Sequence, residues 1–193
     1  MTRRVHLYRF TLLGLALALA CNDGVAPRDS VQASLAAAGR SAFGFNGNAS
    51  GFPTGAVRLT GGGSYDPATA SNVIPSETSV VSSGGFDCTE PVAQGPLTGC
   101  QKDEGVRWDT AQLLDSTTFK CTGADAAKVA RTGPRTAVLV ADFYRAGDGI
   151  HESFTAQMIV SDSDLAPEIL GTQTLWVQGV GCGLANGHFN GKG

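Results

Sequence analysis

The sequence lacks an apolar run long enough to cross a membrane as a helix. Its most apolar run, Phe10 to Ala20, covers 11 residues, whereas a spanning helix needs about 20. Basic residues are not in excess either, because 14 Lys and Arg stand against 17 Asp and Glu. Such a charge balance gives no electrostatic footprint for nucleic acid. We therefore expect no spanning helix and no nucleic-acid partner.

Several motifs that mark catalytic or ligand sites are also missing. The Gly61-Gly62-Gly63 cluster has no Lys-Ser or Lys-Thr after it, which excludes a phosphate-binding loop and leaves a bulge or hairpin as the expectation. No Gly-x-Ser-x-Gly sequence marks a serine nucleophile. His151-Glu152 begins a zinc-protease motif whose second histidine is absent, and no two cysteines have zinc-site spacing. His151 and His188 are expected to be loop residues with no shared role, so we expect no metal and no cofactor.

The N-terminus carries the most informative pattern that is present. Arg3, Arg4 and Arg9 precede the apolar run, and the run ends in small residues just before Cys21. A basic head, a short apolar stretch and a small-residue end predict a secretory signal peptide over residues 1–20. Removing it leaves 14 − 3 = 11 basic residues against 17 acidic ones.

This segment resembles the signal peptide of bacterial lipoproteins, in which the cysteine after the cleavage site receives acyl chains such as palmitate. It departs from the family in having Ala18 where leucine is usual and Leu19 where a small residue is commoner. The resemblance implies lipidation of Cys21 and anchoring to the cell envelope, facing the periplasm or the exterior. Ala18-Leu19-Ala20 also fits an ordinary signal-peptidase site, which would release a soluble protein. We expect residues 21–40 to be a lipidated flexible tether and residues 41–193 a single β domain.

Glycine and alternating segments predict the fold class. The chain has 26 glycines and only 16% charged residues, a composition that favours short strands joined by tight turns. Residues 136–145 and 153–161 alternate with a period of two and flank a Gly-Asp-Gly turn signal, which predicts an antiparallel hairpin. Residues 123–132 are the best helix candidate. We expect an all-β fold, either an antiparallel sandwich or a small barrel, with at most one or two short helices.

Four further cysteines predict two disulfides, because an even set in an exported chain is usually oxidised. Three pairings are possible, and we favour Cys88 with Cys100 and Cys121 with Cys182. The stretch between the first pair contains proline and glycine and can fold back as a turn.

Polar clusters leave two functional classes open. Arg107 and Asp109 flank Trp108, so the pair either orients a ligand such as a sugar or forms a same-face salt bridge on a strand. The first hypothesis is a tethered, non-enzymatic domain that binds a ligand or partner or has a structural role in the envelope. The alternative is an exported small-barrel enzyme with Arg107, Asp142, His151 and Glu152 in a polar cavity. These four side chains would then have to converge in a concave, partly apolar pocket.

Overall fold

The computed structural model describes residues 39–73, 77–148 and 151–190. The predicted signal peptide, Cys21 and nearly all of the predicted tether lie outside these ranges. Within them, no helix has both the length and the apolar character that a membrane span requires.

The described chain is built almost entirely from strands. They are β1 (Ser41–Gly51), β2 (Ala56–Tyr65), β3 (Val80–Glu90), β4 (Arg107–Leu113), β5 (Ser116–Phe119), β6 (Lys128–Arg131), β7 (Thr136–Tyr144), β8 (Phe154–Ser161), β9 (Leu175–Val177), β10 (Gly181–Gly183) and β11 (Ala185–Phe189). A short 3₁₀ turn, η1 (Pro67–Thr69), lies between β2 and β3.

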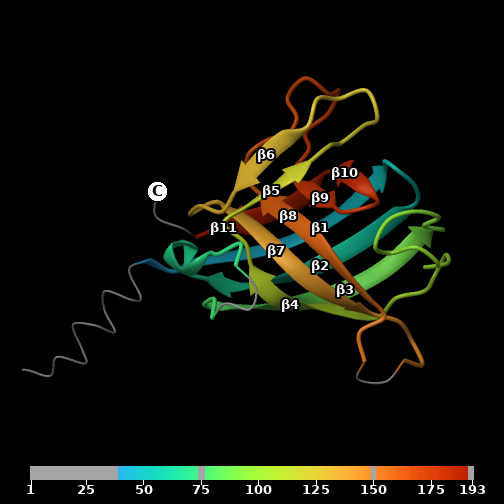
Figure 1. Cartoon of the computed structure of the whole chain (residues 1–193), viewed down its shortest axis with the longest axis horizontal. Helices are drawn as coiled ribbons and strands as arrows, with labels where there is room; N and C mark the ends of the chain where they lie inside the picture. The colour runs from blue at the N-terminus through green and yellow to red at the C-terminus, as the bar shows by residue number, and fades with distance from the viewer. Residues whose placement is uncertain (1–38, 74–76, 149–150, 191–193) are drawn as a thin grey trace, which may run out of the picture.

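Eight strands form a closed antiparallel barrel, as Figure 1 shows. Their order is β1-β2-β3-β4-β7-β8-β9-β10, and β10 pairs back onto β1 at Ser50 and Gly51. The extra strand β11 continues along the same edge of β1, from Gly47 back to Phe43. The expected all-β fold is confirmed, and of the two architectures considered it is the barrel.

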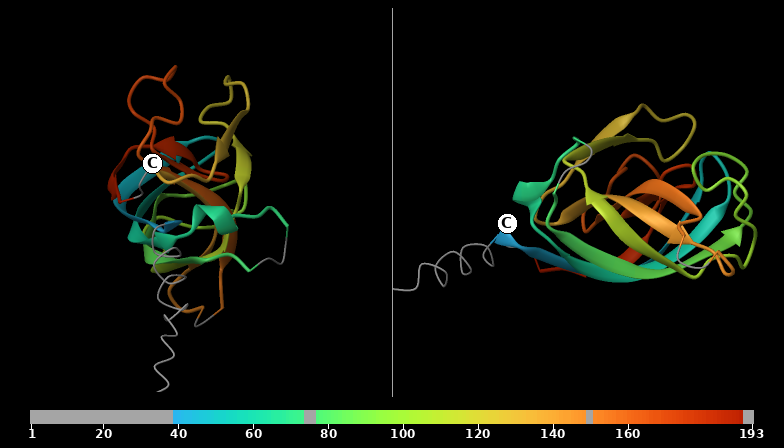
Figure 2. Two further views of the ribbon diagram at one scale, coloured as in Figure 1. Left: turned by 90° about the vertical axis from the view of Figure 1, so that its left-hand side faces the viewer. Right: turned by 60° about the horizontal axis from the view of Figure 1, so that its bottom comes forward.

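Strand alternation sends one set of side chains into the barrel. On β7, Ala137, Leu139 and Phe143 point inward and are fully buried with the other interior side chains. The outward-facing Val138 and Val140 belong to a second apolar cluster, which also includes Phe119 and Trp176. The β5–β6 hairpin stands on this side of the wall, beside the segment that follows β8 (Figures 1 and 2). The outward face of β7 is therefore apolar at Val138 and Val140 because the outer cluster covers it there.

A loop closes one end of the barrel. The segment between β3 and β4 folds back so that Val92 and Leu97 join the interior cluster, with 1% and 0% of their surface exposed. A disulfide joins Cys88 at the end of β3 to Cys100 in this loop, with an S–S distance of 1.93 Å. At the other end Tyr65 is fully buried, and its hydroxyl donates to the carbonyl of Gly133 at 2.8 Å. Side chains thus fill the interior, as an eight-stranded barrel permits.

The second disulfide joins the barrel to the hairpin outside it. Cys182 on β10 pairs with Cys121 just after β5, at an S–S distance of 1.88 Å. Both pairs are those predicted from the sequence. One local prediction was wrong: residues 123–132 contain no helix, and Lys128 to Arg131 form β6 instead. The alternation of this segment places Ala130 in the outer apolar cluster, and β5 supplies hydrogen-bonding partners that a helix this short could not replace.

Candidate binding groove on the outer wall

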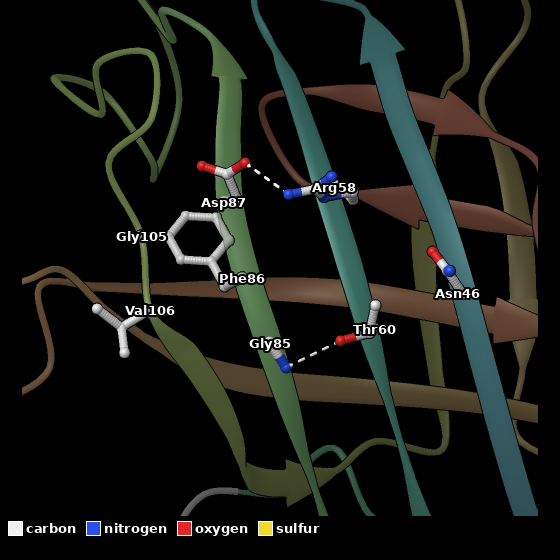
Figure 3. Close-up of a pocket in the computed structure, with 8 residues that line it drawn as sticks. All are labelled: Asn46, Arg58, Thr60, Gly85, Phe86, Asp87, Gly105 and Val106. Atoms are coloured by element: carbon white, nitrogen blue, oxygen red, sulfur yellow. Dashed lines mark hydrogen bonds and ion pairs between the residues drawn. The ribbon is translucent and has the colours of Figure 1, made fainter.

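Most polar side chains of the barrel strands point outward, and one region of the outer wall forms a groove. This groove has a volume of about 440 Å³ and lies over β1, β2 and β3 (Figure 3). Its lining residues come from these three strands and from the segment just before β4; they are Asn46, Arg58, Thr60, Gly85, Phe86, Asp87, Gly105 and Val106.

The segment before β4 forms one wall of the groove because it follows β3 closely. The backbone N–H of Phe86 donates to the carbonyl of Val106 at 3.3 Å, and that of Cys88 donates to Glu104 at 2.8 Å. Gly105 allows this approach, since it has a φ of +141° and a Cβ there would lie 2.5 Å from the Phe86 carbonyl oxygen. The groove is therefore a product of close backbone packing.

Beneath the groove, a tryptophan from inside the barrel interrupts the sheet. The indole N–H of Trp108 donates to the carbonyl of Thr60 at 2.9 Å, and the Thr60 hydroxyl accepts the backbone N–H of Gly85 at 3.2 Å. A Cβ on Gly61 would lie 2.6 Å from the Trp108 ring, so the indole fits here only because residue 61 is glycine. The triple glycine therefore lies within strand β2 rather than in a hairpin turn, and the register shift of β2 against β3 falls elsewhere, between Ala56 and Val57.

An ion pair borders the groove. The Arg58 guanidinium lies 3.2 Å from the Asp87 carboxylate across the β2–β3 pair, as the dashed line in Figure 3 marks. The arginine side chain is 59% exposed and that of the aspartate 25%. An exposed pair of this kind adds little stability. Its remaining donors and acceptors can bind a ligand while the two charges stay paired.

A second hollow of about 490 Å³ lies on the outer surface between β3 and β4. Arg107 and Asp109 border it and form an ion pair at 2.6 Å, while Trp108 between them points inward. The guanidinium lies 3.7 Å above the Tyr144 ring, whose hydroxyl donates to Asp109 at 3.3 Å. Desolvation and the adjacent Asp109 carboxylate raise the pKa of Tyr144. The polar cluster singled out in the sequence is thus a same-face salt bridge on a strand.

The four residues considered for an enzyme do not share a pocket. Arg107 and Asp142 both lie on the outer wall, on β4 and β7, and Asp142 accepts a hydrogen bond from Thr155 at 2.7 Å. His151 and Glu152 are exposed in the segment between β7 and β8. Arg107 borders the second hollow, but none of the four lines the groove of Figure 3. Across the described ranges, no group of three or more His, Cys, Asp or Glu residues is placed to hold a metal ion.

The residues predicted from the sequence did not include a set of amide side chains that lie together on the outer wall. Asn46 and Asn48 are exposed on β1, and Asn186 on β11 lies directly opposite Asn46. His188, which was expected in a loop, also lies on strand β11, with its ring against Gly44. The Asn-x-Asn spacing on an alternating strand could have shown that Asn46 and Asn48 share a face. Nothing local could have brought Asn186 beside them.

Comparison with known proteins finds no family model, no curated protein and no solved structure that matches this chain. Its function therefore has to follow from the placement of its own side chains.

Proposed function

We propose that this protein is exported, is anchored to a bacterial cell envelope through acyl chains on Cys21, and acts there as a non-enzymatic binding domain. The observation that carries the proposal is the filled, closed barrel interior together with a polar groove on the outer wall. Because apolar side chains fill the space inside the barrel, we expect a ligand or partner to bind on the outer surface.

Several features support export and anchoring by the N-terminal tether. The two cysteine pairs suit an oxidising compartment. The chain enters the barrel at the start of β1, and the opposite end carries the β1–β2 turn and the loop between β3 and β4 (Figure 1). A tether ahead of β1 would hold the domain by one end and leave the side wall free. Two or three acyl chains would make the anchor stable, whereas one would be marginal.

The anchor is tested with the full-length Cys21→Ser precursor expressed in a bacterium. We expect wild-type protein in the membrane fraction and labelled by a palmitate analogue, with the variant unlabelled and released in soluble form. Ser34→Ala in the predicted tether is the matched control and should behave as wild type. A Cys21→Ser protein that stays in the membrane fraction would refute lipid anchoring.

The binding part is tested with the soluble Cys21→Ser protein, which keeps the whole barrel. We expect it to bind isolated envelope material, and Arg58→Ala should weaken that binding. Arg131→Ala is the control, because Arg131 forms a comparable exposed pair with Asp115 on the outer hairpin. Equal binding by all three proteins would exclude the groove as the contact.

A further inference from the structure

We infer that the outer wall formed by β11, β1, β2 and β3 binds a neutral, hydroxyl-rich chain, that is, a glycan. The inference deepens the proposed function, since it names the ligand class of the same groove. It rests on three properties of this wall: free amide groups, ion pairs that border the groove and a floor without side chains.

The free amides lie in one band across neighbouring strands. Asn186, Asn46 and Thr60 occupy directly opposed positions on β11, β1 and β2, and Asn48 lies two residues further along β1. The three asparagine side chains make no hydrogen bond to any other part of the chain that the structure describes. Each amide offers donors and an acceptor together, which matches a hydroxyl group that both donates and accepts. Adjacent strands place successive groups about 4.8 Å apart, comparable to the length of one sugar ring.

Two ion pairs border this band. Arg58 is paired with Asp87, and Arg107 is paired with Asp109. A charged ligand would have to displace one partner, whereas a hydroxyl can accept from the guanidinium and donate to the carboxylate without breaking the pair. The excess of acidic over basic residues in the whole chain also disfavours an anionic polymer. The groove therefore suits a neutral ligand.

The floor of the wall allows close approach. Gly44 and Gly62 are directly opposed on β1 and β2, and both occupy outward positions without side chains. The His188 ring lies against Gly44, since the position of a Cβ there is 3.0 Å from the imidazole Cε1. A flat ring beside bare backbone offers a surface on which a sugar ring can lie. The exposed apolar side chains nearby are Val81, Val106 and Leu184, the last beside Asn48, whose N–H donates to the Leu184 carbonyl at 3.2 Å. Three separate side chains are too little for an apolar protein interface.

The test uses the soluble Cys21→Ser protein on an array of neutral and anionic oligosaccharides, followed by calorimetry with the best-bound neutral oligosaccharide. We expect binding to neutral glycans with an affinity that changes less than twofold between 50 and 500 mM NaCl, about the ionic-strength range over which charged contacts are screened. The variant Asn46→Ala/Asn186→Ala should bind about 10-fold to 50-fold more weakly, at roughly fivefold or more per lost hydrogen bond. Gln94→Ala, an exposed amide in the loop between β3 and β4, is the control and should bind as wild type.

Three results would overturn the inference: no glycan binding, binding to anionic glycans alone with a steep loss in salt, or equal losses in the asparagine and Gln94 variants. These failures are distinct from failure of the proposed function. If the soluble protein binds envelope material through Arg58 but binds no glycan, the proposed function stands and the ligand is a protein or another component. If the Cys21 anchor is refuted, glycan binding by the purified barrel still tests the inference.

Discussion

The replacement of Trp108 by phenylalanine tests how the groove is built from beneath. Trp108 is fully buried, and its indole N–H is the hydrogen-bond donor to the Thr60 carbonyl at 2.9 Å. Phenylalanine keeps an aromatic ring at this position but has no donor. Leaving this part-buried carbonyl without its partner costs about 1–3 kcal/mol, and the smaller ring leaves a gap worth about 1 kcal/mol. We therefore expect the free energy of unfolding to fall by roughly 2–4 kcal/mol.

The measurement is urea unfolding followed by circular dichroism, with an unchanged slope of free energy against urea. Trp176→Phe is the matched control, because its indole donates to the Lys120 carbonyl at 3.1 Å beneath the outer hairpin, and this ring is 6% exposed where that of Trp108 is fully buried. We expect this control to lose about 1–2 kcal/mol. The reasoning fails if the Trp108 variant loses less than the control, since the bond to Thr60 would then not support the sheet at the groove.

Two further predictions concern packing and pH. Gly84→Ala should lower the free energy of unfolding by about 1–3 kcal/mol, because a Cβ there would lie 1.8 Å from the Thr60 carbonyl oxygen. Gly133→Ala has nothing within 4 Å of its Cβ position and should stay close to wild type in the same urea unfolding measurement; a larger loss at Gly133 than at Gly84 would contradict this packing. Desolvation raises the pKa of Tyr65 above its ordinary value of about 10 in an unfolded chain. The folded state therefore holds this proton more tightly, so the associated stability is complete below pH 10 and is lost as the pH rises further. Unfolding measured at pH 8 and pH 11 should show a smaller difference in Tyr65→Phe than in wild type, and an equal difference would refute the assignment.

Local sequence patterns predicted strands and their pairing well where the two paired strands follow each other in the sequence. Alternation on residues 136–145 and 153–161 and the turn between them gave the β7–β8 hairpin, whose register pairs Ala137 with Val160. The pairing of the cysteines followed from loop composition and export. Composition misled at residues 123–132, where the polar and alanine content resembled a helix although pairing with β5 makes Lys128 to Arg131 a strand.

Closure of the barrel and the groove could not be predicted in this way. The closing contact joins Ser50 to Cys182, and the amide band joins Asn46 to Asn186. Both depend on the register of strands from opposite ends of the domain, which no local pattern encodes. The hydrogen bond from Trp108 to Thr60 likewise joins two residues that lie 48 positions apart in the sequence. It depends on the close approach of the glycine-containing strands β2 and β3 to this indole.

The direct pairing of Phe43 on β1 with Phe189 on β11 makes the first and last strands of the domain neighbours. The order of the strands is therefore circular in sequence as well as in space. A short peptide could join Asn190 to the start of β1, and new ends could be opened in an exposed turn without changing any strand pair. A reporter fused after β11 would likewise lie beside the point where the tether enters, and the far end of the barrel would stay unobstructed.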